Sequence, residues 1–185
     1  MRLKSALRRG VAAAVIAGIV VSSGIPAYAK TWNIADGDIT VKGASDESGN
    51  YNNVKQGDKD FEKDTDTVIT SKSDKSEESK EHTVTIDTSK GNVDVTFDDL
   101  KIDVSGKTEV DGSGDGPARE SKAAVTVQGG GDATIELDGD NELKSGGYHA
   151  GLEKNDERSE DDEIISGKLT IKDDNDTKGL SLIHI

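Results

Sequence analysis

The chain has 185 residues, no cysteine, and 37 acidic against 23 basic residues, which gives a formal net charge of −14. Nucleic acid and anionic lipid surfaces are disfavoured as partners, because both would be repelled by such a chain. The absence of cysteine excludes disulfide bonds and thiolate metal sites.

Residues 1–29 carry the pattern of a secretory signal peptide. Four basic residues between positions 2 and 9 precede an apolar stretch over residues 11–21, and the small-residue pattern Ala27-Tyr28-Ala29 closes the segment. The apolar stretch is shorter than the roughly 20 residues that span a bilayer. We therefore expect a secreted mature chain that begins at Lys30, is not inserted in the membrane and carries a net charge of −18 (19 − 37).

The mature chain is predicted to be all-β. Low hydrophobic content (31%) and high charge are typical of disorder, but five segments alternate apolar and polar residues with period two. Such alternation in β-branched residues, bounded by Gly, Asp and Asn, indicates strands. The segments are residues 82–87, 93–97, 123–127, 133–137 and 168–171.

The strands form strand-turn-strand units that resemble one another, over residues 83–97, 124–137 and 151–171. Each second strand leads into an acidic turn. The spacing is irregular, with 40 residues from Val95 to Ile135 (135 − 95) and 27 from Ala124 to Gly151 (151 − 124). Units that cannot bury a face alone favour a β-solenoid. A β-sandwich with the same strands is the alternative.

Polar stretches separate the predicted strands and are interpreted as partly disordered loop insertions on one side of a strand scaffold. They are rich in Ser, Lys, Asp, Glu and Asn. They cover residues 46–67, 72–81, 107–121 and 155–166.

The last six residues, 180–185, read Leu-Ser-Leu-Ile-His-Ile and differ abruptly in composition from the Asp/Gly/Lys-rich stretch before them. One reading frame of a transposase adapter used in sequencing libraries encodes the same six residues. We expect that residues 180–185 derive from an adapter and that the natural chain continues beyond Gly179. The alternative is a genuine apolar C-terminal strand.

Three blocks of sequence resemble the carbohydrate-binding-domain proteins of Gram-positive gut and cellulolytic bacteria. The blocks are residues 31–41, residues 134–143, and residues 148–153 together with 167–175. The resemblance implies a right-handed parallel β-helix over residues 30–179, and binding of polysaccharide, which in some relatives is acidic and accompanied by calcium. Residues 156–166 interrupt the family pattern.

Calcium is the predicted cofactor, because it takes about six to eight hard oxygen ligands from carboxylates, carbonyls and amides. Acidic turns supply such oxygens, although Asp, Asn and Gly are also ordinary turn formers. Turn asparagines at these positions could also stack in a ladder. The candidate ligands are Asp138, Asp140 and Asn141 in one turn and Asp173, Asp174 and Asn175 in the next.

Polysaccharide is the predicted partner, and Trp32 and Tyr148 are the candidate aromatic platforms for a sugar ring. For a uronate-rich polymer, calcium would bridge carboxylates of ligand and protein. A calcium-free mode would need Arg119, Arg158 or Lys144.

Two other function classes stay open, a passive stalk of a larger adhesin and a calcium-dependent polysaccharide lyase. Arg119 and Arg158 lie in polar loops that are poor supports for catalysis, and the chain has no recognisable nucleophile motif. We therefore expect a binding protein rather than an enzyme, either secreted or attached to the cell wall through a region beyond Gly179.

Overall fold

The computed structural model describes residues 29–47, 49–71, 78–106, 122–159 and 161–173, and the backbone of residues 182–183. This part of the chain holds sixteen β-strands and one short 3₁₀ helix, η1 (Ile34–Asp36), and no α-helix. The all-β prediction is confirmed. Apart from Ala29, the predicted signal peptide lies outside the described residues, as does the predicted loop at 107–121.

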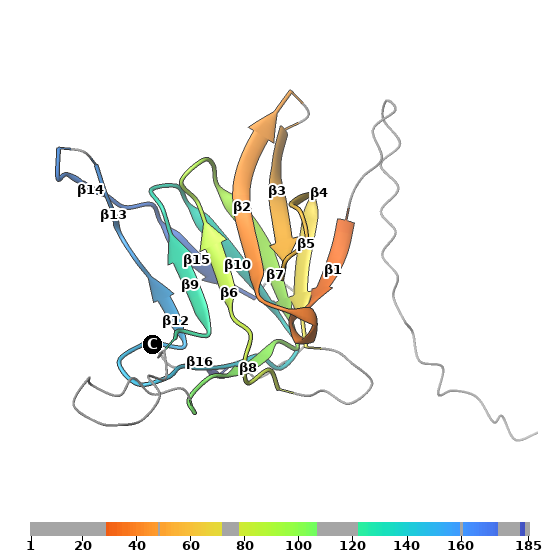
Figure 1. Cartoon of the computed structure of the whole chain (residues 1–185). Helices are drawn as coiled ribbons and strands as arrows, with labels where there is room; N and C mark the ends of the chain where they lie inside the picture. The colour runs from red at the N-terminus through yellow and green to blue at the C-terminus, as the bar shows by residue number, and fades with distance from the viewer. Residues whose placement is uncertain are drawn as a thin grey trace, which may run out of the picture.

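The strands form three larger sheets and one two-stranded ribbon (Figure 1). Sheet A is parallel throughout and contains, in spatial order, β1 (Ala29–Asn33), β5 (Asp66–Thr70), β7 (Val93–Asp98), β10 (Ala133–Asp138) and β15 (Leu169–Lys172). Sheet B contains β12 (Leu152–Lys154), β9 (Val125–Gln128), β6 (Val84–Asp87), β2 (Ile39–Asp46), β3 (Gly49–Gln56) and β4 (Glu62–Asp64). Its first four strands are parallel, whereas β2–β3 and β3–β4 are antiparallel.

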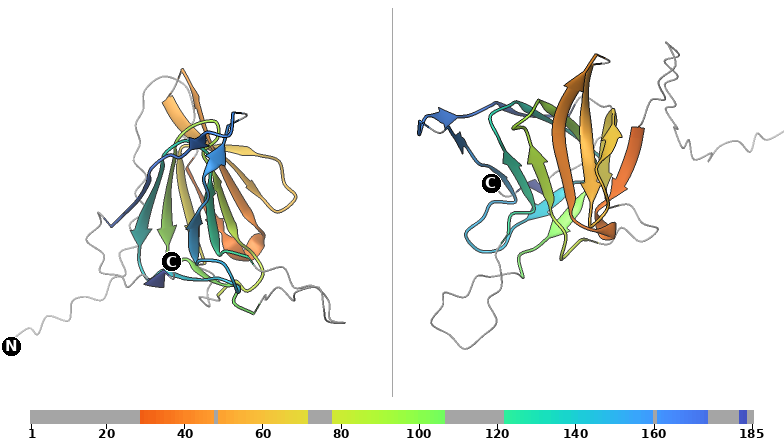
Figure 2. Two further views of the ribbon diagram at one scale, coloured as in Figure 1. Left: turned by 90° about the vertical axis from the view of Figure 1, so that its left-hand side faces the viewer. Right: turned by 45° about the horizontal axis from the view of Figure 1, so that its top comes forward.

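The third sheet, sheet C, is short and parallel and contains β16 (Leu182–Ile183), β11 (Glu142–Lys144) and β8 (Lys101–Asp103). The ribbon pairs β13 (Glu157–Arg158) with β14 (Ile164–Ile165) in antiparallel fashion. Sheets A and B face each other, and sheet C runs along the lower side (Figure 1 and Figure 2).

Whether residues 180–185 derive from an adapter stays a prediction.

The chain passes through sheets B, A and C in the same order three times. The passages are β6–β7–β8, β9–β10–β11 and β12–β15–β16, and each strand pairs in parallel with its counterpart in the neighbouring passage. Val95 is in register with Ile135, the 40-residue spacing seen in the sequence, and Val125 with Leu152 repeats the 27-residue spacing. The repeated units therefore stack strand on strand.

The core lies between the sheets because alternate residues of each strand point inward. In sheet B the inward residues of successive strands are in register, as in the row Val41, Ile86 and Val127, and all three are buried. In sheet A, Phe97 lies between Ile69 and Leu137 in the same way. Burying such side chains contributes about 1.5–3 kcal/mol each. These rows join the passages into one core.

The polar loop predicted at 46–67 is wrong, because this stretch forms all of β3 and β4 and the start of β5. Two of the three buried residues of β3 are amides, Asn52 and Gln56, which are bonded internally on either side of Val54. The Asn52 side-chain amide donates to Thr67 Oγ1 at 2.9 Å, and that of Gln56 donates to the Asn33 carbonyl at 2.5 Å. Counting apolar residues misses a strand in which most buried positions are amides. Within the predicted loop at 155–166 the structure likewise places β13 and β14.

A column of glycines runs beside the turns from sheet B to sheet A, consisting of Gly43, Gly91, Gly131 and Gly167. A Cβ on any of these glycines would meet backbone of a neighbouring strand or turn at 3.2 Å or less. The backbones approach each other there because the passages are stacked at strand spacing. Glycine is therefore required in this column by close approach.

Asp87, at the end of β6, is held by hydrogen bonds from the backbone N–H and hydroxyl of Ser89, and its Oδ2 lies 3.7 Å from Lys42 Nζ. Burial raises the pKa of Asp87, but the Ser89 hydrogen bonds and Lys42 outweigh burial and hold the pKa below 3.8. A carboxyl group whose pKa is lower in the folded state stabilises the protein at pH values above its unfolded pKa of about 3.9. This contribution is lost as the pH falls through the pKa of the folded state.

We expect Asp87→Asn to be less stable than the parent at pH 7, and the difference to shrink below about pH 4. Urea unfolding of both chains at pH values from about 2 to about 7 measures the difference in their free energies of unfolding. This range includes the unfolded pKa of about 3.9 and the lower pKa of the folded state. A difference in unfolding free energy that stays constant across the range would contradict the assignment.

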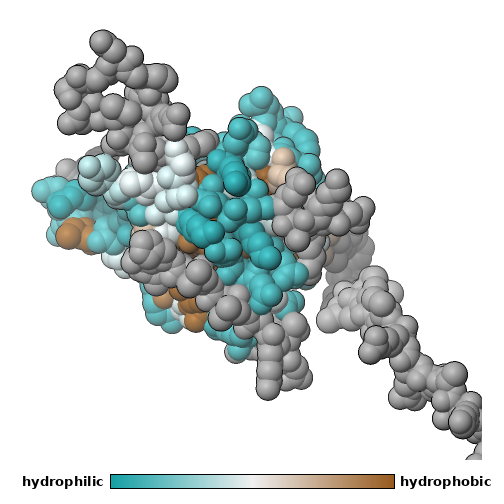
Figure 3. Space-filling view, turned by 90° about the horizontal axis from the view of Figure 1, so that it is seen from below, coloured by the Kyte–Doolittle hydropathy of each residue, from teal (hydrophilic) through white to brown (hydrophobic). Residues whose placement is uncertain are grey.

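No helix in the described ranges is long and apolar enough to cross a membrane. Seen from below, on the side of sheet C, the described surface is mostly hydrophilic, with separate small hydrophobic areas (Figure 3).

Candidate functional site

A groove with a volume of about 260 Å³ lies on the outer face of sheet A. It crosses four parallel strands, β5, β7, β10 and β15. The strand alternation that buries Val95 and Ile135 points their neighbours outward, so polar residues of successive passages meet there. The lining residues are Thr65, Asp66, Thr67, Asp94, Val95, Thr96, Thr134, Glu136 and Lys172.

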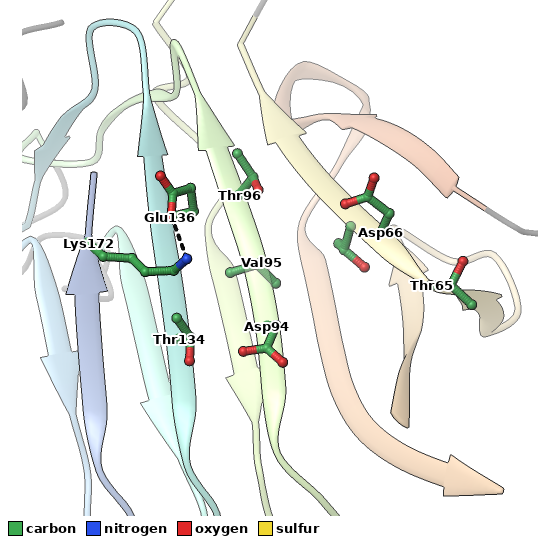
Figure 4. Close-up of a pocket in the computed structure, with 9 residues that line it drawn as sticks. Thr65, Asp66, Asp94, Val95, Thr96, Thr134, Glu136 and Lys172 are labelled. Atoms are coloured by element: carbon green, nitrogen blue, oxygen red, sulfur yellow. Dashed lines mark ion pairs between the residues drawn. The ribbon is translucent and has the colours of Figure 1, made fainter. Parts of the chain in front are cut away.

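The groove side chains stand in two rows across the strands. Asp94 is in register with Thr134, and Thr96 is in register with Glu136, which is in register with Lys172. The ammonium of Lys172 reaches across to Glu136 Oε2 at 3.0 Å (Figure 4). This cross-strand ion pair spans one side of the groove.

A second, smaller hollow of about 50 Å³ adjoins the first, since both are lined by Thr65 and Asp94. Tyr51 of β3 also lines this smaller hollow. Lys63 Nζ lies 4.0 Å from the centroid of the Tyr51 ring and is bonded to Asp46 at 2.7 Å, so the ring is held from one side. The remaining lining residues are the amides Asn50, Asn52 and Asn92.

The combined surface is rich in hydrogen-bonding groups and predominantly acidic. Asp66 and Asp94 are exposed, whereas Glu136 is half-buried and its charge is balanced by Lys172. Carboxylates accept hydrogen bonds, and threonine hydroxyls both donate and accept. Such a surface suits a ligand that offers many hydroxyl groups, and it opposes a polyanion unless cations intervene.

The predicted calcium turn at 138–141 is used within the protein. Asn141 is 1% exposed, its side-chain carbonyl accepts from Leu100 N at 2.9 Å, and its amide donates to the Asp138 carbonyl at 3.0 Å. The backbone N–H of the exposed Asp140 donates to Asp99 Oδ1 at 2.7 Å. Asn141 thus links two successive passages.

Of the other predicted calcium ligands, Asp173 is exposed, and Asp174 and Asn175 lie outside the described residues. Among the residues with described side chains, no group of three or more His, Asp or Glu is arranged to hold a metal ion. Calcium binding stays a prediction.

The two predicted aromatic platforms occupy opposite environments. Trp32 is 2% exposed, and its indole N–H donates to Asp64 Oδ2 at 2.7 Å. Tyr148 is 94% exposed, with φ of 67°, in the turn between β11 and β12. Neither residue lines the groove.

Two of the three cations suggested for an anionic glycan, Lys144 and Arg158, form ion pairs with acidic residues of the protein. Lys144 Nζ lies within 4 Å of Glu142, Glu78 and Asp103, and the hydrogen bond to Glu142, followed by that to Glu78, raises its pKa. Arg158 is bonded to Asp162 at 2.8 Å. Arg119 lies outside the described residues.

Sequence reasoning did not single out the groove residues. The available signal was the strand alternation itself, which assigns Asp94, Thr96, Thr134 and Glu136 to the outer face. Combined with the 40-residue spacing, it places them side by side. Tyr51 gave no such signal, because its strand was interpreted as a loop.

No protein-family model matches the sequence, and no curated protein or solved structure is significantly similar to it.

Proposed function

We propose that this chain is a secreted carbohydrate-binding module, built on part of a right-handed parallel β-helix, which holds a hydroxyl-rich polysaccharide in the outer groove of sheet A. The β-helix is supported by the repeated order of sheets B, A and C and by the in-register parallel pairs between passages. Parallel crossover connections are right-handed in about 98% of cases. A β-sandwich would instead pair antiparallel strands, which within the described ranges occur only at β2–β3–β4 and β13–β14.

The observation that carries the proposal is a polar groove running across four strands of successive passages. Its volume of about 260 Å³ is below the roughly 300–1,000 Å³ of pockets that enclose drug-sized ligands. A groove of this kind suits a segment of a polymer better than a whole small molecule. Tyr51 at one end offers a ring edge or face to a sugar, beside the amides and carboxylates that bond its hydroxyls.

The charge of the groove favours a neutral polysaccharide. Asp66 and Asp94 are exposed carboxylates, and the cation lining the groove, Lys172, is paired with Glu136. A uronate polymer would be repelled unless calcium bridged the carboxylates, as expected from the sequence. Binding of a neutral polysaccharide and binding of a uronate polymer therefore differ in their dependence on calcium.

The test is affinity electrophoresis of the chain beginning at Lys30, through gels containing a neutral xylan or polygalacturonate, each with calcium or with EDTA. We expect retardation by xylan in both conditions. Tyr51→Ala and Asp94→Ala should each weaken binding about tenfold, or about 1.4 kcal/mol, through loss of sugar stacking or of a hydroxyl acceptor.

Two matched controls locate the site. Tyr148→Ala removes an exposed tyrosine outside the groove, and Asp161→Ala an exposed aspartate, so both should bind as the parent does. Loss of binding with Tyr148→Ala would move the site to the turn between β11 and β12. Calcium-dependent retention on polygalacturonate alone would favour the acidic ligand. Absence of retention on either polymer would favour a passive stalk, and release of unsaturated uronates would indicate a lyase.

A further inference from the structure

Asp64, the last residue of β4, is a buried carboxylate that has no cationic partner among the described residues. It is 0% exposed, and its described hydrogen-bond partners are three N–H groups. They are the backbone N–H groups of Lys30 and Asp66, each at 3.2 Å, and the indole N–H of Trp32 at 2.7 Å. All three donors are neutral in the uncleaved chain.

The ammonium groups of the two lysines close to this site in the sequence, Lys30 near Trp32 and Lys63 beside Asp64, are bonded to other acidic residues. Lys30 Nζ bonds to Glu62 Oε2 at 2.8 Å and lies over the Trp32 ring, whereas Lys63 bonds to Asp46. A buried carboxylate is costly unless a positive charge or strong hydrogen bonds compensate it. The described surroundings of Asp64 supply hydrogen bonds but no countercharge.

Cleavage of the signal peptide would create a positive charge at a backbone nitrogen that already donates to Asp64. The Lys30 nitrogen that donates to Asp64 belongs to the peptide bond at which the sequence predicts signal-peptide cleavage, after Ala27-Tyr28-Ala29. Hydrolysis of the Ala29–Lys30 bond adds water, so Ala29 leaves with a carboxylate and Lys30 keeps the nitrogen as an α-amine. This amine is protonated below its pKa, which is ordinarily about 7.7–8.0.

We propose that Asp64 is the receptor for the new N-terminus, so that cleavage after Ala29 converts a neutral hydrogen bond into a partly buried ion pair that fastens β1 to β4. The proposal goes beyond glycan binding and rests on the predicted cleavage position. It gives a reason for a fully buried aspartate at the N-terminal edge of the fold. Charge-assisted hydrogen bonds are about twice as strong as neutral ones.

The groups that face the Lys30 nitrogen determine its pH dependence. Asp64 of β4 accepts a hydrogen bond from this nitrogen, Glu62 of β4 pairs with the Lys30 ammonium, and Asp66 of β5 donates its backbone N–H to the same Asp64 oxygen. The acidic groups outnumber the cation, so the pKa of the α-amine is expected above its ordinary value. An amine whose pKa is higher in the folded state stabilises the protein at pH values below its unfolded pKa of about 7.7. This contribution is lost as the pH rises through the pKa of the folded state.

The test compares the chain that begins at Lys30 with an extended chain that begins at Ala27. Both keep the hydrogen bond to Asp64, but only the first carries the charge at that nitrogen. We expect the Lys30 form to unfold about 3 °C or more higher at pH 7, and the advantage to fade in alkaline solution. The same pair with Asp64→Asn should show no such advantage.

A second measurement does not depend on the variant folding. NMR titration of the ¹⁵N-labelled Lys30 α-amine in the unsubstituted chain should give a pKa above about 8.0. An ordinary pKa, equal unfolding temperatures for the two forms at pH 7, or an advantage that survives Asp64→Asn would each overturn the proposal. Glycan binding is measured separately, so failure here leaves the groove untouched.

Discussion

Phe97→Ala should lower the free energy of unfolding by about 3–5 kcal/mol, because it removes a large, fully buried side chain and leaves a cavity. Phe97 lies in register between Ile69 and Leu137 of the neighbouring strands, so it packs against the passages on both sides. A loss of this size is a large fraction of the roughly 5–15 kcal/mol that stabilises a typical domain. Urea unfolding measures it as a lower midpoint with an unchanged slope.

The chain provides its own matched control, because Phe61 is its other phenylalanine. Phe61 is 43% exposed, and Lys42 Nζ lies 5.1 Å from its ring centroid. An exposed cation–π contact contributes about 0.5–1 kcal/mol, so Phe61→Ala should cost no more than about 1 kcal/mol. Similar losses for the two substitutions would mean that Phe97 is not a core residue linking successive passages.

The strands with apolar alternation could be predicted because their inward side chains are hydrocarbons. Residues 93–97 and 133–137 appear as β7 and β10 with at most one residue of difference at each end. The spacing from Val95 to Ile135 even gave the register of the pair. Periodicity is informative there because the core selects Val, Ile, Leu and Phe at every second position.

Strands β3 and β4 of sheet B could not be predicted in this way, because several of their inward positions are polar. Asn52, Gln56 and Asp64 are all buried, and each is bonded to backbone or side chains 15 or more residues away in the sequence. Their partners come together only in the folded chain. Polar residues with such partners look like a solvated loop in the sequence.

The sequence did not predict the position of the candidate groove. The sequence indicated aromatic and acidic groups for a glycan, and it named Trp32, Tyr148 and the turn at 138–141. The structure buries Trp32 and uses Asn141 to link two passages. The groove depends on which strands are neighbours, and this follows from the order of the sheets rather than from any local motif.

Gly43→Ala should destabilise the protein by about 2–3 kcal/mol, the cost of forcing extra volume into a packed position. A Cβ at Gly43 would lie closer than 3.0 Å to the Gly91 carbonyl and to Asn92 O, which are backbone atoms of the next passage. Backbone cannot move aside without breaking the pairing of β2 with β6. The same change at Gly147, where a Cβ would meet nothing within 4 Å, should be neutral or stabilising by up to about 1 kcal/mol. Denaturant midpoints of the two variants measure the difference, and equal midpoints would mean that the passages are not stacked as closely as the glycine column requires.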